Sequence, residues 1–199
     1  MRGRLLAAVV GVLAGSAYAD LLNGDIESNS SGMFGAIDFW GPNGGWADHA
    51  GFARPGNAGL GLYFGFYSGG LTETVGQVSS MTFAAGQTYT FSSWATGGGN
   101  DTGVISYEIG YDGGGGNFVQ LAVATYDLTG LGMWVQTAGV SHAVGSGGAE
   151  IGRNIWVRLG DGTTGSSDDI WFDNLTLVPS PGAMATLALG GLALARRRR

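Results

Sequence analysis

The chain has 199 residues, of which 40 are glycine, and it contains neither cysteine nor lysine. The missing cysteines exclude a disulfide framework and any cysteine-based metal or nucleophile chemistry. Six of the nine arginines lie at the two ends of the chain, so residues 20–178 carry three arginines against fifteen acidic residues, a net charge of −12. This charge excludes nucleic acid as a partner, because phosphate binding needs a positive surface.

The first 19 residues are typical of a signal peptide. Two arginines precede an apolar run from Leu5 to Leu13, which is shorter than a membrane-spanning helix. Ala17 and Ala19 supply the small residues that signal peptidase accepts. We therefore expect a signal helix over residues 1–19 that signal peptidase removes between Ala19 and Asp20. An uncleaved anchor helix is the alternative.

Residues 20–178 alternate short apolar runs with clusters of glycine, which is typical of strands joined by tight turns. The clearest runs are 59–68, 87–95, 104–111 and 154–159, and further strands are expected at 73–81, 118–128, 133–144 and 169–178. No segment of this region has the periodicity of an amphipathic helix. The pattern predicts an all-β fold, a single antiparallel β-sandwich domain over residues 20–178.

Period-two alternation places one face of each run in the core. The residues expected to point inward are Tyr89, Phe91, Ile105, Tyr107, Ile109, Ile155, Val157 and Leu159. In the last run, Phe172 and Leu175 are three residues apart and so fall on opposite faces. A β-bulge at Asp173–Asn174 would return both side chains to the core.

Several short motifs occur in the order found in a known group of jelly rolls. The segments are Leu22-Asn-Gly-Asp-Ile-Glu27, Ala85-Gly-Gln-Thr-Tyr-Thr-Phe-Ser-Ser-Trp94, Asn154-Ile-Trp-Val-Arg-Leu159 and Trp171-Phe-Asp-Asn-Leu-Thr-Leu177. Together they resemble the galactose-binding-like jelly rolls, which include many carbohydrate-binding modules. Ile26 stands where that group usually has an aromatic residue. The resemblance implies a jelly-roll sandwich whose first and last strands lie close together.

The same resemblance implies a structural calcium ion between the first and last strands. The matching acids are Glu27 and Asp173, with Asp25 as a third candidate. Hard cations prefer oxygen ligands of this kind. The alternative is that Glu27 is a solvated edge residue and that Asp173 caps the bulge through backbone hydrogen bonds.

Aromatic residues opposite the expected core predict a carbohydrate-binding face. The candidates are Trp94, Trp156, Tyr63 and Tyr67, because the flat C–H faces of sugar rings pack on aromatic rings. Glu108 and Arg158 could supply hydrogen bonds to sugar hydroxyls. The alternative is that these aromatics are scattered over an ordinary solvated surface.

Catalysis is not expected from this sequence. The chain has two histidines, His49 and His142, and Ser141 beside His142 would point to the opposite face of a strand. The fifteen acidic residues keep a pair of carboxylates for glycoside cleavage open as an alternative.

Residues 179–199 form a distinct tail. Pro179-Ser180-Pro181 is followed by an apolar stretch, and the chain closes with Arg196, Arg197, Arg198 and Arg199. The tail resembles the PEP-CTERM sorting signal, with Ser180 where that signal usually has glutamate. The resemblance implies a short C-terminal hydrophobic helix, recognition by an exosortase, and transient or stable anchoring at the membrane.

These features together predict an exported, non-enzymatic protein of the cell surface or extracellular matrix whose β-sandwich binds a polysaccharide. Two alternatives remain open. One is a purely structural surface protein without a small ligand, and the other is a small enzyme that acts on glycans.

Overall fold

The computed structural model describes residues 21–22, 24, 39–40, 62–65, 74–97, 103–161 and 169–181. The predicted signal peptide with Ala19 and Asp20, and the tail beyond residue 181 with its four terminal arginines, lie outside these ranges. Within them, no helix is long and apolar enough to span a membrane. The strands are β1 (Leu62–Gly65), β2 (Thr74–Thr82), β3 (Gln87–Gly97), β4 (Val104–Asp112), β5 (Phe118–Asp127), β6 (Val135–Gln136), β7 (Val140–Ala143), β8 (Asn154–Asp161) and β9 (Asp169–Pro181).

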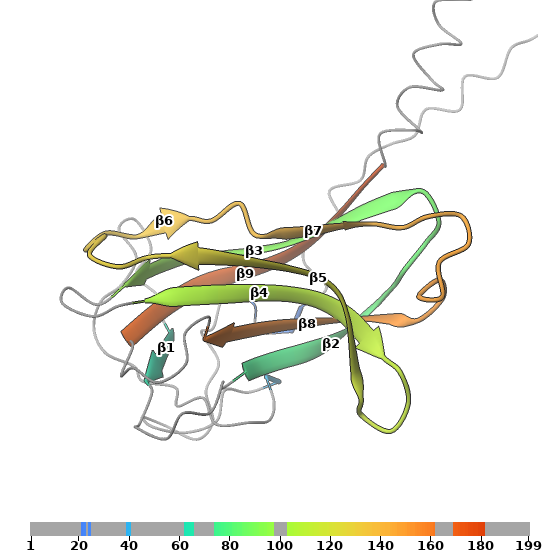
Figure 1. The fold of residues 1–199 in the computed structure, drawn as a ribbon, viewed down its shortest axis with the longest axis horizontal. Coiled ribbons are helices and arrows are strands. Elements are labelled where there is room, and N and C mark those ends of the chain that lie inside the picture. The colour runs from blue at the N-terminus through green and yellow to red at the C-terminus, as the bar shows by residue number, and fades with distance from the viewer. Residues whose placement is uncertain are drawn as a thin grey trace, which may run out of the picture.

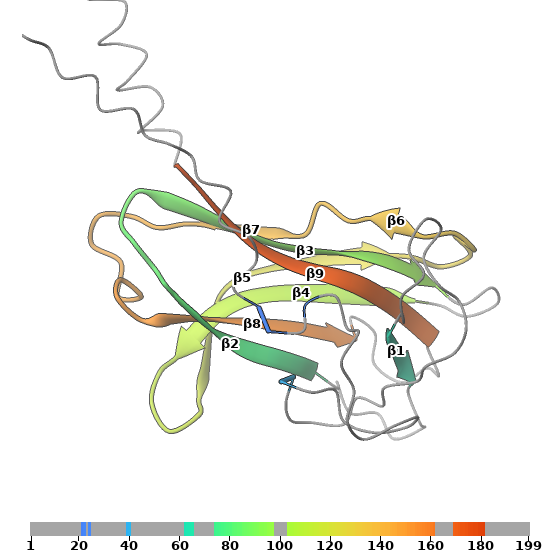
Figure 2. The same ribbon diagram turned by 180° about the vertical axis from the view of Figure 1, so that it is seen from behind.

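The described strands form two antiparallel sheets. One sheet has the order β1-β9-β3-β6, with β7 also paired to β3, and the other has the order β2-β8-β4-β5. In Figure 1, β4 and β5 lie in front of β3 and β9, and in Figure 2, from behind, the order is reversed. The prediction of an all-β antiparallel sandwich is therefore confirmed for the described part of the chain.

The core lies between the two sheets and is built from the alternating residues that the sequence indicated. Tyr89 and Phe91 of β3 are buried, and the inward residues of β4 and β8 have no exposed surface at all: Ile105, Tyr107, Ile109, Ile155, Val157 and Leu159. The Tyr107 hydroxyl is satisfied by the Ser93 hydroxyl at 2.7 Å. Burial raises the pKa of Tyr107 to about 12, so this group stays protonated.

The predicted bulge in the last strand is confirmed. On β3, Ser92 pairs with Thr176 and Trp94 pairs with Asp173, so β9 holds one extra residue between these pairs. Asn174 takes a φ of 54°, the left-handed conformation that asparagine tolerates better than most residues. As a result, Phe172 and Leu175 are both buried on the core side of the sheet.

The predicted strand at 133–144 is instead two short strands, β6 and β7. Gly139, between them, has a φ of 67°, which a regular strand cannot contain. Its carbonyl oxygen accepts a hydrogen bond of 2.6 Å from the Tyr126 hydroxyl of β5. This bond joins the two sheets along one side of the sandwich.

The last strand extends beyond the predicted domain boundary at residue 178. Pro179, Ser180 and Pro181 pair with Tyr89, Thr88 and Gln87 of β3. Proline is accepted in a sheet where its nitrogen faces an open edge, and the two prolines are two residues apart, so both nitrogens face the same way. The Pro-Ser-Pro element predicted as part of the tail is thus the end of a sheet strand.

Three described residues near the N-terminus, Leu22, Gly24 and Phe39, form hydrogen bonds to β2 and β9. The backbone N–H of Leu175 donates to the carbonyl oxygen of Gly24 at 2.7 Å. The Gln77 side chain of β2 accepts from Leu22 N–H at 2.7 Å and donates to the Leu22 and Phe39 carbonyls at 2.9 and 3.0 Å. Gly24 therefore lies beside the last strand, and the expected first strand over residues 22–27 lies mostly outside the described residues.

Candidate functional site

The six residues predicted to bind sugar do not share one surface. Trp156 and Arg158 of β8 and Glu108 of β4 lie on the outer face of the four-stranded sheet, between the fully buried core positions of those strands. Trp94 of β3 and Tyr63 of β1 belong to strands of the five-stranded sheet. Tyr67 lies outside the described residues. The sequence prediction combined positions that belong to opposite sheets, because alternation gives a residue's face but not its sheet.

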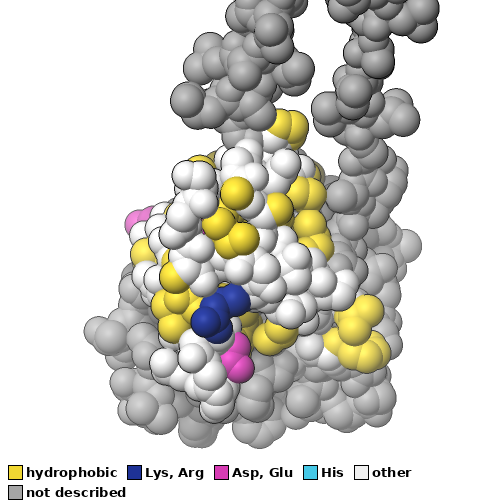
Figure 3. Space-filling view, turned by 90° about the vertical axis from the view of Figure 1, so that its right-hand side faces the viewer, with side chains coloured by type: hydrophobic (Ala, Val, Ile, Leu, Met, Phe, Trp, Pro, Cys, Tyr) yellow, Lys and Arg dark blue, Asp and Glu magenta, His cyan; other side chains and the backbone are white. Residues whose placement is uncertain are grey.

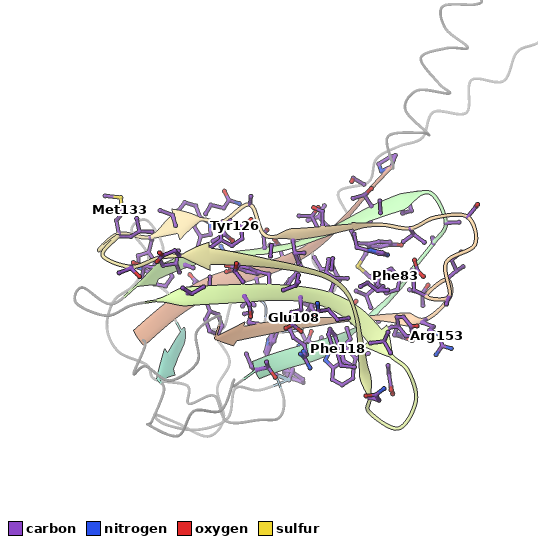
Figure 4. All side chains as sticks on the ribbon, in the orientation of Figure 1. Phe83, Glu108, Phe118, Tyr126, Met133 and Arg153 are labelled. Carbon is purple, nitrogen blue, oxygen red and sulfur yellow. The ribbon has the colours of Figure 1, made fainter. Side chains whose placement is uncertain are left out.

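Four side chains form a compact group on the outer face of the four-stranded sheet, which we call the Trp156 cluster. Its members are Trp156, Arg158, Glu108 and Phe118. The Phe118 ring meets the Trp156 ring edge-to-face, with centroids 5.3 Å apart and planes at 87°. The Arg158 guanidinium carbon lies 3.9 Å from the Phe118 ring centroid. Glu108 and Phe118 project on the same side of β4 in Figure 4.

An ion pair fixes the polar side of the Trp156 cluster. Arg158 donates from Nε and Nη2 to the same carboxylate oxygen of Glu108, Oε2, at 2.9 and 2.6 Å. The Glu108 side chain is 12% exposed and that of Arg158 is 26% exposed. Such short, charge-assisted bonds in a partly desolvated place hold both side chains in fixed positions.

Two glycines make room for the Trp156 cluster. A Cβ at Gly110 of β4 would overlap the Val119 carbonyl oxygen and would lie 2.6 Å from the Phe118 ring, and a Cβ at Gly76 of β2 would lie 2.9 Å from Nε1 of Trp156. The pairing of β4 with β5 also shifts register beside Gly110. Bulges of this kind often re-aim side chains next to functional sites.

Several polar atoms of the Trp156 cluster remain available. Oε1 of Glu108, Nη1 of Arg158 and Nε1 of Trp156 make no hydrogen bond within the described part of the chain. The neighbouring Val78 and Val123 are 52% and 49% exposed and pair with Trp156 and Glu108. The surface thus combines aromatic and aliphatic area with a free acceptor and free donors, the combination that a sugar ring and its hydroxyls need.

Phe118 is the member of the Trp156 cluster that the sequence prediction missed. It stands at the first position of its strand, one residue beyond the glycine-rich turn at 113–116, where no alternation precedes it to set its face. The usable signal was Gly110, a small residue in the middle of an otherwise bulky strand. Such a glycine indicates close approach of another group.

Asp173, the predicted calcium ligand on the last strand, is 2% exposed. Its Oδ1 accepts a 2.6 Å hydrogen bond from the backbone N–H of Asn174, at the bulge. The other predicted ligands, Glu27 and Asp25, lie outside the described residues. Among the residues that are described, no three His, Asp or Glu side chains gather as a metal site would require.

A histidine–carboxylate pair lies at the end of the sandwich where the 144–153 loop is found. Nε2 of His142 and Oε1 of Glu150 are 3.1 Å apart, and the Phe83 ring packs edge-to-face on the imidazole at 5.7 Å. The backbone N–H of Glu150 itself, opposed by burial and helped by His142, lowers the pKa of this carboxyl below 4.5. Figure 3 looks onto this end, whose visible described surface carries few charged side chains.

We predict that Glu150 makes the fold sensitive to acid. A folded-state pKa below the unfolded value contributes stability above the unfolded pKa, and this contribution is lost as the pH falls through the folded pKa. The melting temperature of the wild type should therefore fall more between pH 6 and pH 3 than that of Glu150→Gln, which keeps a hydrogen-bonding oxygen. Parallel curves for the two proteins would contradict this role.

Comparison with known proteins identifies the fold. No protein-family model and no curated protein matches the sequence. Solved structures with similar folds include the Stig cyclase Fisc from Fischerella sp. TAU, crystallised with an indole derivative, at 12% identity and a TM-score of 0.65. The alignment covers 84% of this chain and 100% of the cyclase.

Carbohydrate-binding modules are among the similar structures. Family 16 Carbohydrate Binding Module-2 aligns with a TM-score of 0.52 and 21% identity over 79% of this chain and 98% of its own. A CBM4 structure aligns with a TM-score of 0.51 and 16% identity over 80% and 99%. At these identities the likeness shows a shared fold. The chain is a jelly-roll β-sandwich of the architecture found in carbohydrate-binding modules and in Stig cyclases.

Proposed function

We propose that this protein binds an uncharged polysaccharide through the Trp156 cluster on the outer face of its four-stranded sheet. The observation that carries the proposal is the arrangement of Trp156, Phe118, Arg158 and Glu108, which sets an aromatic pair beside a fixed ion pair that keeps hydrogen-bonding capacity. The fold of carbohydrate-binding modules supports it. An uncharged ligand is favoured because a domain with a net charge of −12 repels acidic chains.

The proposal assigns a binding role and no catalysis. The Trp156 cluster contains no histidine that could act as a base. Within the described residues, His142 and Glu150 form a pair, but this pair packs against the Phe83 ring at the end of the sandwich. Glu108, the one acid of the Trp156 cluster, is engaged by Arg158. Turnover of a labelled polysaccharide by the purified protein would contradict a purely binding role.

The experiment that tests the proposed function is a screen of the full-length chain on immobilised glucans, xylans and mannans, with the heat-unfolded protein as control. We expect retention on at least one polysaccharide, and release by its soluble oligosaccharide. Absence of retention of the folded protein across the whole panel would overturn the proposal in favour of a structural surface protein.

We further propose that the chain is exported and sorted to the cell surface. The support is in the sequence: a signal-peptide pattern ending at Ala19, and a tail with an apolar stretch and four terminal arginines that is similar to an exosortase substrate. Signal peptidase and an exosortase are the implied partners. Mass spectrometry of the exported protein should find a new N-terminus at Asp20, and an intact N-terminus would contradict this processing.

We also propose that a structural calcium ion joins the N-terminal segment to the last strand. The hydrogen bond from Leu175 N–H to the Gly24 carbonyl oxygen places Gly24 beside β9. Leu175 is two residues after the buried Asp173 on β9, and Asp25 directly follows Gly24 in the chain. Chelation should lower the melting temperature by several degrees, and added calcium should restore it. The Asp173→Asn variant should lose most of this response, and an unchanged wild-type melt on chelation would contradict the site.

A further inference from the structure

The outer face of the five-stranded sheet carries a regular array of small side chains. Strands β7, β3 and β9 run side by side there, as Figure 2 shows. The pairing places three sets of neighbours across these strands: Thr88 with Ala143 and Ser180, Thr90 with Ser141 and Val178, and Ser92 with Thr176. Most of these residues carry a hydroxyl group, and we call the array the hydroxyl platform.

The hydroxyl platform is accessible and uncharged. Ser141, Ala143, Val178 and Ser180 are exposed, and the three β3 residues are partly exposed. None of the positions in the array carries a charge, in a region of the chain where acidic residues outnumber arginines by fifteen to three. A partner for this face therefore has to be neutral and rich in hydrogen-bonding groups.

Four of the hydroxyls already bond in two pairs, and the Ser180 hydroxyl donates to the Thr88 carbonyl oxygen at 3.4 Å, but the array keeps capacity for a ligand. The hydroxyl oxygens of Thr90 and Ser141 are 2.8 Å apart, and those of Ser92 and Thr176 are 3.1 Å apart. Each hydroxyl has one donor and two acceptor lone pairs. The Thr90–Ser141 pair uses one of its two donors internally, so it presents the other donor and unused lone pairs to whatever lies on the sheet.

An aromatic residue ends the hydroxyl platform. Trp94 follows Ser92 on the same face of β3, opposite Gln136 of β6 and Asp173 of β9, and is partly exposed. From Thr88 to Trp94 the strand advances by about 20 Å at roughly 3.3 Å per residue. A row of hydroxyls of this length that ends on an indole matches several sugar units of an extended chain.

We propose that the hydroxyl platform and Trp94 form a second polysaccharide-binding surface, so that the sandwich holds glycan on both outer faces and bridges two chains. The choice of a polysaccharide as ligand rests on the proposed function. The second surface itself lies on the other sheet, away from the Trp156 cluster. A protein partner fits less well, because interfaces between proteins rely on large buried anchors. Apart from Trp94 at one end, the largest apolar side chain of this surface is Val178.

The test uses the full-length chain and a soluble neutral polysaccharide identified in the retention screen. Bridging is read by light scattering, which should rise at intermediate protein-to-glycan ratios and fall when protein is in excess. Thr90→Lys places a long charged side chain on the platform, and Ser146→Lys, in the exposed loop between β7 and β8, is the matched control. Both variants should melt within a few degrees of the wild type.

We expect Thr90→Lys and Trp156→Ala each to lose bridging but to keep weakened retention, and the double variant to lose retention by at least tenfold more than either. Unchanged bridging in Thr90→Lys would overturn the second surface. If Trp156→Ala alone reduced retention to the background level, the second surface would also be overturned, but the proposed function of the Trp156 cluster would stand. No retention of the wild type on any glycan would overturn both proposals.

Discussion

Replacement of Trp156 by alanine is expected to weaken retention on the preferred polysaccharide by at least tenfold. The substitution removes the larger ring of the aromatic pair, and the Phe118 ring loses its edge-to-face partner at 5.3 Å. Aromatic anchors at binding surfaces typically contribute about 2 kcal/mol or more, and a tenfold change in affinity corresponds to about 1.4 kcal/mol. Affinity electrophoresis in gels that contain the polysaccharide measures the change.

Two variants separate binding from stability. Trp134→Ala removes a partly exposed tryptophan from the segment before β6, outside the Trp156 cluster, and should leave retention unchanged. Phe118→Leu keeps apolar volume but removes the ring, and should weaken retention less than Trp156→Ala does. Wild-type retention by a folded Trp156→Ala protein would show that the Trp156 cluster is not the binding surface.

Replacement of Gly139 by alanine is expected to destabilise the fold more than any other single-methyl change at a described glycine with positive φ. The residue has a φ of 67°, and a Cβ there would overlap the Phe91 carbonyl oxygen in the neighbouring strand. Left-handed backbone costs about 1–2 kcal/mol for alanine, and overpacking adds about 1–3 kcal/mol. We expect a loss of about 2–5 kcal/mol in the free energy of unfolding, measured by urea denaturation.

Gly86 provides the matched control for this substitution. Its φ of 74° is nearly the same, but a Cβ there would meet nothing within 4 Å. Gly86→Ala should therefore cost only the backbone term of about 1–2 kcal/mol. Equal losses in the two variants would show that the close approach of Gly139 to β3 adds nothing to its role.

Alternation alone predicted most of the fold. The strands at 87–95, 104–111 and 154–159 and their buried apolar residues were predicted because one face of each strand packs on a mainly apolar core. The bulge at Asp173–Asn174 was also predictable, since Phe172 and Leu175 could reach the same core in no other way. The break at Gly139 was not, because a lone glycine in a strand pattern is compatible with either a bulge or an interruption.

The candidate site was less accessible to sequence reasoning. Trp94 and Trp156 were both placed correctly on an outer face, but they lie on different sheets. Which strands pair is set by contacts far apart in the chain, such as that of Arg158 with Glu108, fifty residues earlier. The alternation of residues along one strand does not indicate which strand pairs with it. The two surfaces were therefore read as one.

The measurement that tests the central claim most directly is an NMR titration of the full-length chain with the soluble oligosaccharide found in the screen. The six tryptophans give separate indole N–H signals, and the signal that disappears in Trp156→Ala belongs to Trp156. We predict that this signal shifts with increasing ligand and saturates, while that of the buried Trp40 stays in place. A ligand that binds without moving the Trp156 signal would contradict the account.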